Sequence, residues 1–385
     1  MDRSPDDYID PVQIERELAA IWATIDGQQK GGRGTVTRAS MSNVMIFCDG
    51  EAQALDAANR IPLLVQHHPA RVLVLALIAD HPGDDVRAWV TAHCRRTSDG
   101  TQLCAEHIEL RFGASSAERA ASVVRSLLIA DLPSAMWWLS PRPPALAGAV
   151  FDAFAPMAEQ IIYDSVGWSD PPRAVLAMTR WAKSHRTVIF NLAWRRLKPW
   201  RRILAQSLAP TLVPGALQRI DAIELRHGPH ALPLAWLLLG WLACRLGWQP
   251  RQGIAKTGDQ LTWQFERGTG RSNAGGGNPR PIQIKVHRDN EGAALIDQMR
   301  IAWHGDGEQP AGSADYRHEG HYIRHFPSDP ALLPSSIPAP EQRLEQMVAA
   351  QLAHRAGDAL FTDAIAISEA MAKVMKAKDA ATLSQ

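Results

Sequence analysis

The sequence has 385 residues, of which 46% are hydrophobic and 21% are charged, a composition typical of a folded globular protein. Lysine and arginine number 41 against 40 aspartate and glutamate, so the net charge of +1 gives no overall field that would draw the chain to nucleic acid or to an anionic membrane. The length exceeds one ordinary hydrophobic core and predicts two domains.

No segment predicts export or membrane insertion. The N-terminus, MDRSPDDYID, is acidic and polar, without the basic and apolar regions of a signal peptide. The longest apolar run, residues 231–244, is shorter than the roughly 18 residues that span a bilayer and predicts a buried helix instead. Four cysteines without a CxxC pair predict reduced thiols. We therefore expect a cytoplasmic protein that binds no membrane.

Strand and helix alternate through the first half of the chain. Residues 71–78, RVLVLALI, form a continuous apolar run typical of a strand buried on both faces of a parallel sheet. Further strands are predicted at residues 35–48, 103–112, 133–139 and 161–163, and helices at residues 12–25, 51–66, 84–94, 117–130 and 170–184. The alternation predicts an α/β layered domain whose sheet is largely parallel.

Strands follow a helix in the second half, beyond a boundary near residue 190. A helix is predicted at residues 232–246, and strands at residues 221–226, 261–266, 281–288 and 295–303. Near the C-terminus one apolar helical stripe consists of Leu344, Met347, Val348 and Leu352. Gly357 ends this stripe, and residues 361–375 form a partner helix. We expect an α/β domain over residues 1–190 and, over residues 191–385, an α+β domain with a C-terminal helical hairpin.

Glycine-rich nucleotide-binding motifs are missing from the sequence. Neither GxGxxG nor GxxxxGK[ST] occurs, and Gly31, Gly32 and Gly34 precede a predicted strand, which favours a turn over a phosphate-binding loop. Residues 275–277, GGG, are interpreted as linker because no strand leads through them into a helix. We therefore expect no bound nucleotide cofactor.

Catalytic and metal-binding patterns are equally weak. GxSxG is absent, and the paired aspartates at residues 6–7 and 84–85 have no companion histidine or lysine at a catalytic spacing. His318, His321 and His325 could supply imidazole ligands to zinc, but their segment has no second ligand set, so surface histidines are favoured. The sequence predicts no catalytic residue and no metal.

Cys94 and Cys104 are ten positions apart and could form a disulfide if their Cα atoms came within about 6 Å. A thiol switch is one hypothesis for this pair. Because spacing alone does not show proximity, two unrelated thiols are the favoured interpretation.

Residues 191–206, NLAWRRLKPWRRILAQ, combine two tryptophans, five cations and one proline. Trp194, Leu197, Trp200 and Leu204 recur at spacings that place them on one side of a helix. Pro199 suits the first helical position, which places Lys198 at the N-cap. Arg201 and Arg202 then fall in the first turn, where the helix dipole disfavours cations. An external anion, an acidic partner surface or an internal carboxylate would each account for them.

The same stretch resembles the DLAW-R-L-PWR-LLAQ signature of the OpcA family, the glucose-6-phosphate dehydrogenase assembly proteins. Asn191 replaces the usual aspartate, and Lys198 replaces the usual serine or threonine. Other segments resemble the family in the same order: 38–44 (RASMSNV), 68–75 (HPARVLVL), 131–138 (DLPSAMWW), 162–165 (IYDS) and 238–248 (LLGWLACRLGW).

This resemblance implies a non-enzymatic regulator that binds glucose-6-phosphate dehydrogenase and favours its active assembly or conformation, so that NADP and substrate belong to the partner. The expected partner-binding residues are Trp194, Arg195, Arg196, Trp200, Arg201 and Arg202. For the two tryptophans an interdomain seam is an equal alternative, because aromatic stripes are usually core. The residues leave open whether the partner is assembled or allosterically activated.

Two other functions are compatible with parts of the sequence. A sugar-phosphate or nucleotide-binding α/β enzyme would use the basic helix as its anion site. A nucleic-acid-binding protein would use RRLKPWRR, but the net charge of +1 makes this the least favoured function, and we expect no nucleic-acid partner.

Overall fold

The computed structural model describes residues 10–29, 36–38, 40–79, 85–96, 102–256, 260–268, 280–307 and 309–375. These residues form two compact units. The first unit contains residues up to 164 together with 184–192 and 343–356, and the second contains 165–183, 193–342 and the residues from 357 onward. Each unit therefore draws on separate parts of the chain, and the linear boundary near residue 190 stays a prediction.

The first unit is built on an eight-stranded sheet with the order β1-β5-β3-β2-β6-β7-β8, and β4 pairs with β5. Its strands are β1 (Val36–Arg38), β2 (Asn43–Asp49), β3 (Arg71–Leu77), β4 (Val86–Arg96), β5 (Gln102–Phe112), β6 (Ser134–Trp138), β7 (Gln160–Tyr163) and β8 (Val188–Asn191). All pairings are parallel except that of β4 with β5. The strand order reverses between β2 and β6, as in doubly wound nucleotide-binding folds. The predicted, largely parallel α/β sheet is confirmed.

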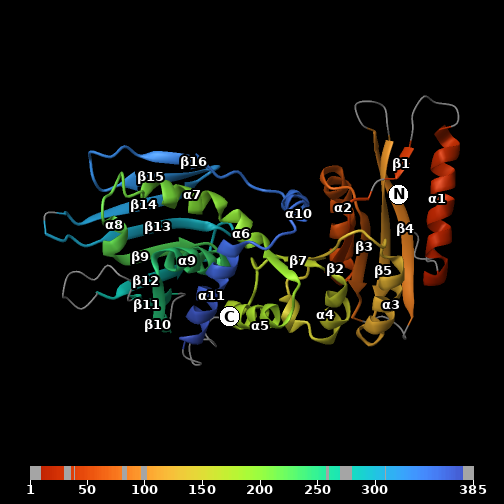
Figure 1. The fold of residues 1–385 in the computed structure, drawn as a ribbon, viewed down its shortest axis with the longest axis horizontal. Helices are drawn as coiled ribbons and strands as arrows, with labels where there is room; N and C mark the ends of the chain where they lie inside the picture. Colours follow the sequence, from red (N-terminus) through yellow and green to blue (C-terminus); the bar gives the residue numbers. More distant parts are fainter. Residues whose placement is uncertain are drawn as a thin grey trace. The chain divides into compact units, whose positions relative to one another are not determined.

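Helices cover both faces of this sheet. They are α1 (Ile14–Gln29), α2 (Glu51–His67), α3 (Ala117–Leu127), α4 (Ala149–Phe154) and α10 (Leu344–Leu352). Helix α1 lies on one side and α2 on the other (Figure 1). Strand β3 is buried along its whole length, RVLVLAL, because helices pack on both of its faces.

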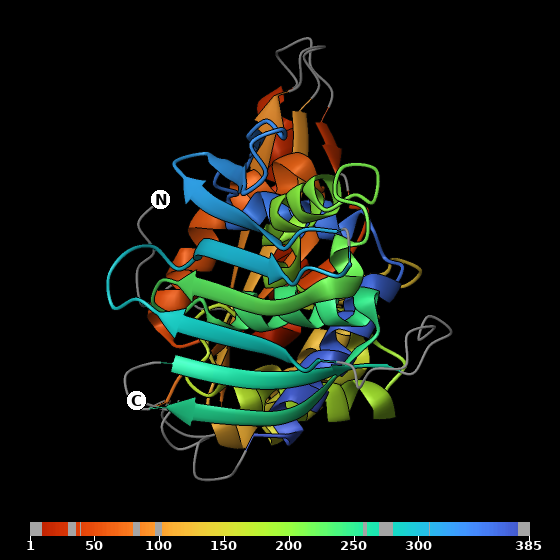
Figure 2. The ribbon, with the colours of Figure 1, turned by 90° about the vertical axis from the view of Figure 1, so that its left-hand side faces the viewer.

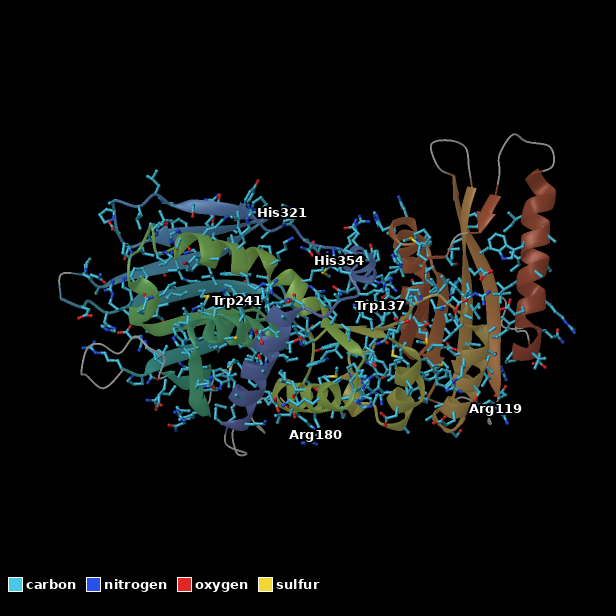
Figure 3. All side chains as sticks on the ribbon, viewed as in Figure 1. Arg119, Trp137, Arg180, Trp241, His321 and His354 are labelled. Carbon is cyan, nitrogen blue, oxygen red and sulfur yellow. A yellow bond between two sulfur atoms is a disulfide. The ribbon has the colours of Figure 1, made fainter. Side chains whose placement is uncertain are left out.

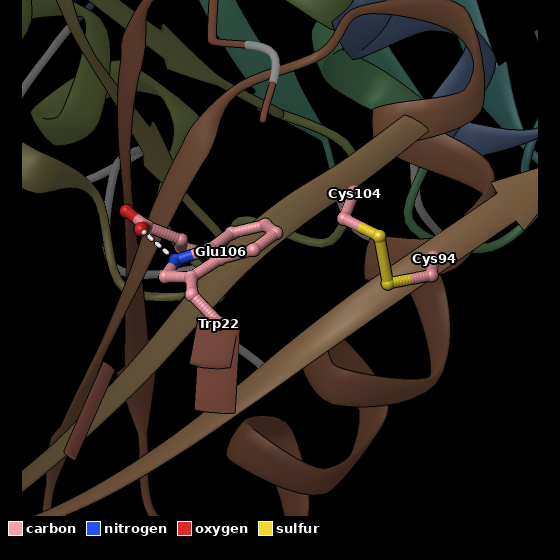
Figure 4. Close-up of a disulfide and its surroundings, with 4 residues drawn as sticks. All are labelled: Trp22, Cys94, Cys104 and Glu106. Carbon is pink, nitrogen blue, oxygen red and sulfur yellow. Dashed lines mark hydrogen bonds between the residues drawn. A yellow bond between two sulfur atoms is a disulfide. The ribbon is translucent and has the colours of Figure 1, made fainter. Parts of the chain in front are cut away.

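A buried ion cluster ties α1 to the sheet. The carboxylate of Glu106 is fully buried and accepts from Arg71 Nε at 2.6 Å. It also accepts from Trp22 Nε1 at 2.8 Å (Figure 4). Arg71 also donates to Glu15 Oε1 at 2.9 Å and to the carbonyl of Leu127 at 2.6 Å. Several partners therefore satisfy both buried charges, which is the condition under which a protein tolerates them.

The second unit contains an eight-stranded sheet with the order β10-β11-β12-β9-β13-β14-β15-β16 (Figure 2). Its strands are β9 (Ile220–His227), β10 (Trp248–Lys256), β11 (Gln260–Arg267), β12 (Ile282–Arg288), β13 (Ile296–Trp303), β14 (Gly312–Glu319), β15 (Tyr322–Pro327) and β16 (Ser335–Pro338). Only β12 and β9 pair in parallel. Burial alternates along β12, where Ile282, Ile284 and Val286 point inward, so one face packs on helices and the other meets solvent.

The helices of the second unit are α5 (Pro171–Ser184), α6 (Leu192–Arg196), α7 (Lys198–Ser207), α8 (Ala216–Arg219), α9 (Leu232–Leu246) and α11 (Ala359–Lys373). The apolar helix predicted at residues 232–246 is confirmed as α9, and its C-terminus is closed by Gly247 in the left-handed conformation. Helix α11 packs closely along α9.

Gly240 allows this close approach, because a Cβ at this position would lie 2.5 Å from the carbonyl oxygen of Ala364.

The C-terminal helices do not form the predicted hairpin. Helix α10 packs on α2 in the first unit, whereas α11 packs on α9 in the second. The apolar stripes had been assigned correctly, but each stripe finds its hydrophobic partner in a different unit. Strands β8, β10, β14, β15 and β16 were not predicted.

The helix predicted at residues 84–94 is wrong, because Val86–Arg96 forms strand β4. Strand β4 pairs with β5 along its whole length, and this pairing places Cys94 directly opposite Cys104. The two cysteines form a disulfide with a Cα–Cα distance of 4.0 Å (Figure 4), so the favoured interpretation of two unrelated thiols is also wrong. The pairing of β4 with β5, which spacing alone does not show, is what brings the two cysteines together.

Candidate functional site

Helices α6 and α7 carry the six residues that the sequence singled out. Helix α7 begins one residue earlier than predicted, with Leu197 as its N-cap and Pro199 at its second position. Leu197 has helical dihedral angles, φ −79° and ψ −3°, and its N–H donates to the carbonyl of Ala193. The two helices therefore follow one another with almost no break.

Trp194 is an internal anchor of the second unit. Its side chain is 1% exposed, and its Nε1 donates to Asp358 Oδ2 at 2.7 Å. Phe361 of α11 packs against the indole with ring centroids 5.8 Å apart. Asp358 also caps α11, because its Oδ1 accepts from the N–H of Phe361 at 3.2 Å. Trp194 thus joins α6 to the start of α11.

Arg201 covers the other face of Trp194. Its guanidinium carbon lies 3.4 Å from the indole centroid, a stacked cation–π contact. Burial lowers the pKa of Arg201 to about 10, while the nearby charge of Asp358 opposes this shift. Within the described part of the chain Arg201 Nη1 is buried without a hydrogen-bond partner. The internal carboxylate that could account for Arg201 is therefore Asp358.

Other cations of the same helices face outward. Lys198 and Arg202 are exposed, and Arg195 is half-buried, with its pKa lowered by burial. No ion pair joins these three cations to any residue that the structure describes. They form a cationic face, defined here as Arg195, Lys198 and Arg202.

A groove of about 440 Å³ adjoins the two helices. Arg196, Pro199 and Trp200 line one side of it, and His318 and His321 of the β14–β15 hairpin line another. Figure 3 shows His321 at the turn of this hairpin. Trp200 is 4% exposed, so it forms part of the wall and offers little surface of its own. No local sequence pattern indicates the groove, because its walls come from segments far apart in the chain.

The six predicted partner-binding residues thus occupy different environments. Trp194, Trp200 and Arg201 are integrated into the second unit, whereas Arg195, Arg196 and Arg202 lie at its surface or line the groove. Their role in binding a partner stays a prediction. Asp358 was missed, although an aspartate directly before an apolar run is a common N-cap signal.

Two other sequence patterns have definite positions. His318 and His325 lie on neighbouring strands, and His325 Nδ1 is 3.3 Å from Ser335 Oγ. Among the described residues no group of three histidine, cysteine, aspartate or glutamate side chains could hold a metal ion. The glycines at residues 31–34 and 275–277 lie outside the described residues.

The switch point of the first sheet is occupied by side chains. In doubly wound folds a dinucleotide binds above the carboxyl ends of the strands at this point. Here Phe47 of β2 and Trp138 of β6 stack with ring centroids 3.9 Å apart, and Phe151 packs edge-on against Trp138. Arg142 Nη2 donates to Asp49 Oδ2 at 2.7 Å at the end of β2. The three aromatic side chains are at most 1% exposed, so protein atoms fill this position.

The turn from β2 to α2 also differs from a phosphate-binding turn. It contains one glycine, Gly50, at φ 103°. A dinucleotide-binding turn uses three glycines to let the backbone approach a pyrophosphate.

None of the helices in the described ranges is long and apolar enough to cross a membrane.

Two family models match the chain. The glucose-6-phosphate dehydrogenase subunit N-terminal domain matches residues 63–180, and the C-terminal domain of the same subunit matches residues 187–365. The chain is 31% identical over 196 residues to a "Putative OxPP cycle protein OpcA" of Nostoc punctiforme and 30% identical over 202 residues to one of Synechocystis sp.. These alignments cover 50% and 51% of this chain but only 41% of each relative.

Among solved structures the fold is similar to that of a super-repressor mutant of Gal80p from Saccharomyces cerevisiae. The TM-score is 0.51, with 9% identity, and the match covers 89% of this chain and 97% of that chain. This likeness concerns the fold alone. The two matched domain models, which together run through both units, and the OpcA relatives lead to one conclusion: the chain belongs to the OpcA family of glucose-6-phosphate dehydrogenase subunits.

Proposed function

We propose that this protein is a non-enzymatic assembly factor and allosteric activator of glucose-6-phosphate dehydrogenase in the oxidative pentose phosphate pathway. The family description names a subunit of that enzyme, and the curated relatives are named for the oxidative pentose phosphate cycle. The observation that carries the proposal is the cationic face, whose Arg195, Lys198 and Arg202 have no ion pair with the described residues. An acidic surface of the partner supplies the complementary charge.

The base beneath the cationic face is rigid. Trp194 is held by Asp358, by Phe361 and by the guanidinium of Arg201, and α7 packs on β15 and β16. A preorganised surface loses little conformational entropy when it binds, so more of the contact energy remains as affinity. The exposed cations accelerate encounter and select an acidic partner more than they add to affinity.

The groove beside the cationic face is suited to an apolar anchor of the partner. Its apolar walls include Leu197, Leu234 and Ile296, and Arg196 also lines it. Interfaces gain most of their binding energy from a few anchors that fill such pockets, with charged residues at the rim.

The filled switch point supports a role without catalysis. A nucleotide-dependent enzyme on this fold would need open space above β2 and β6, where Phe47, Trp138 and Phe151 pack together. The alternative of a nucleotide-binding enzyme is therefore the weaker proposal. In the preferred one, NADP and the sugar phosphate bind to the partner.

Activation requires that this protein bind the competent state of the enzyme more tightly than the incompetent one. A difference of about 1.4 kcal/mol in binding free energy shifts that equilibrium about tenfold. Binding both states equally would assemble the enzyme without activating it.

The test combines purified protein with the glucose-6-phosphate dehydrogenase of the same organism. We expect co-elution on size exclusion and a higher maximal rate or a lower apparent KM. Arg202→Glu should weaken co-elution, whereas Arg173→Glu, an exposed site on α5 of the same unit, serves as the matched charge control. Absence of both co-elution and any kinetic change would refute the proposal, and equal effects of the two substitutions would remove the cationic face from it.

A further inference from the structure

A second cavity lies within the first unit, at the edge of the sheet opposite to the switch point. It has a volume of about 400 Å³ and lies where β2, β6, β7 and β8 begin. Its walls include Ser42, Ser134, Glu159, Gln160, Arg186 and Arg355. This volume suits a small metabolite better than a dinucleotide.

The floor of the cavity is held by the backbone. The N–H of Asn43 donates to the carbonyl of Pro133, that of Glu159 to the carbonyl of Ser134, and that of Val188 to the carbonyl of Glu159, each at 2.9 Å. Four consecutive strand entries are therefore fixed relative to one another. Such a frame presents its side chains in one geometry, which is the condition for a preformed site.

Two arginines of the cavity have no ion-pair partner among the described residues. Arg186, in the segment before β8, and Arg355, after the end of α10, are both exposed, and neither makes an ion pair with any part of the chain that the structure describes. Burial and then the positive charge of Arg355 hold the pKa of His68 below its usual value. His68 Nε2 lies 2.9 Å from the hydroxyl oxygen of Ser42, a lining residue, so the field of Arg355 reaches the cavity wall.

Gln160 offers an acceptor that no described residue uses. Its side chain is 2% exposed, and its Nε2 donates to the carbonyl of His354 at 3.3 Å. Figure 3 shows His354 just beyond the end of α10. Because a carbonyl oxygen only accepts, the amide nitrogen must face His354, and Oε1 is left buried without a partner among the described residues. Buried acceptors are nearly always satisfied, so a donor from outside the chain is expected here.

Hydroxyl chemistry is also present on the wall. Ser134 Oγ accepts from Asn43 Nδ2 at 3.2 Å, which leaves its own hydrogen free to be donated. Glu159 is exposed beside it and can accept from two hydroxyl groups. The cavity thus combines two guanidinium groups with a set of acceptors that match hydroxyl donors.

We propose that this cavity binds a small polyhydroxylated phosphate monoester, with its phosphate between Arg186 and Arg355 and its hydroxyl groups on Gln160 and Glu159. Two guanidinium groups match the double charge of a phosphate monoester, and their planar donors suit its oxygens. This site shares no residue with the cationic face, so its test is separate from the test of glucose-6-phosphate dehydrogenase binding.

The experiment is isothermal titration calorimetry on the full chain alone, without a partner enzyme. The probes are glycerol 3-phosphate, ribose 5-phosphate and glucose 6-phosphate, compared with inorganic phosphate, the three parent alcohols and citrate. At least one of the phosphate esters should bind with a stoichiometry of one and about tenfold more tightly than inorganic phosphate. The parent alcohols should bind too weakly to measure.

Three variants test the assignment of residues. Arg186→Gln and Arg355→Gln should each weaken binding of the preferred ester about tenfold, because each removes a charge-assisted contact to the phosphate. Arg125→Gln, at an exposed site on α3 of the same unit, is the matched control and should bind as the unchanged protein does. All three positions are exposed, so the melting temperatures should remain close to that of the unchanged protein.

Several results would overturn the proposal. These are no binding of any ester, equal binding of inorganic phosphate, tighter binding of citrate, or binding that both glutamine variants leave unchanged. None of these results would bear on co-elution with the dehydrogenase, because that test uses different residues and a different readout.

Discussion

The neighbouring arginines of α7 provide a sharp test of which cations hold the fold and which are available to a partner. Arg201 stacks on Trp194, and Arg202 is exposed without an ion pair to the described residues. We predict that Arg201→Glu destabilises the second unit, whereas Arg202→Glu leaves its stability nearly unchanged and weakens partner binding. The two substitutions make the same change of charge at adjacent positions.

The structure sets the size of the effect at Arg201. The stacked contact with the indole contributes about 1 kcal/mol. A glutamate at this position would also place a second carboxylate near Asp358, whose charge already acts on Arg201, and partly buried like charges cost about 1 kcal/mol more. A loss of about 2 kcal/mol lowers the melting temperature of a unit of about 200 residues by roughly 4–8 °C. Surface substitutions such as Arg202→Glu usually change stability by less than about 0.5 kcal/mol.

The assay is thermal unfolding followed by circular dichroism, together with co-elution with glucose-6-phosphate dehydrogenase. Arg202→Glu should weaken the association about tenfold at low salt and less at high salt, since exposed charges are screened. Equal melting temperatures for the two variants would refute the internal role of Arg201. Unchanged association of Arg202→Glu would refute the external role of Arg202.

Three further predictions concern other parts of the fold. Asp358→Ala should lower the free energy of unfolding by about 2–4 kcal/mol in urea titrations, because it removes a helix cap and leaves the buried Nε1 of Trp194 without an acceptor. Asp358→Asn should retain most of the cap, and equal losses of stability in the two variants would contradict this reasoning. Reducing the disulfide of Cys94 and Cys104, which are ten residues apart, should lower the free energy of unfolding by about 2–3 kcal/mol in the same titration and make Cys94 available for alkylation. Unchanged stability and reactivity after reduction would contradict the pairing. Burial lowers the pKa of His68 in the folded state, so the unfolded state binds the proton more readily and the free energy of unfolding should fall as the pH drops below about 6.5. A His68→Gln variant should flatten this part of the stability profile, and an unaltered profile would exclude His68 as its source.

Much of the fold follows from patterns that are local in the sequence. The run RVLVLAL of β3 has no polar position, which only a strand covered on both faces can accommodate, so a parallel sheet could be predicted from it. The apolar helix α9 was predicted with its observed bounds from its run of apolar residues, and Gly247 in the left-handed conformation ends it.

The misassigned elements depend on partners that are distant in sequence. The side chains of Val86–Arg96 are compatible with a helix or a strand, and pairing with β5 stabilises the strand. The apolar stripe of α10 could pack against any apolar surface. Its actual neighbour, α2, lies almost three hundred residues earlier in the chain, as the contact of Arg60 with Glu345 shows. Short strands such as β8 and β16, with four residues each, leave too little pattern to recognise.

The candidate site divides in the same way. Spacing placed Trp194 and Trp200 on one side of a helix, and in the structure both side chains are at most 4% exposed. Nothing in the spacing showed that Arg201 would lie over an indole, or that Asp358, 164 residues after Trp194, would accept from it. Sequence periodicity reports which face is buried but not which residues meet there.

The helix dipole contributes little to the role of the cations on α7. A basic first turn is unfavourable when its N–H groups are unsatisfied, which left an external anion, an acidic partner surface and an internal carboxylate as explanations. In the structure α6 leads into α7 almost without a break, because the N–H of Leu197, the N-cap of α7, donates to the carbonyl of Ala193 in α6 at 3.3 Å. The dipole at this point is therefore weakened, and it gives little reason for an anion to bind here. Arg202 differs in being exposed without an ion pair to any described carboxylate, whereas Arg201 lies close to Asp358. An acidic partner should accordingly be recognised by side-chain charge and not by the helix terminus, so substitutions at Arg202 should alter the salt dependence of association more than its geometry.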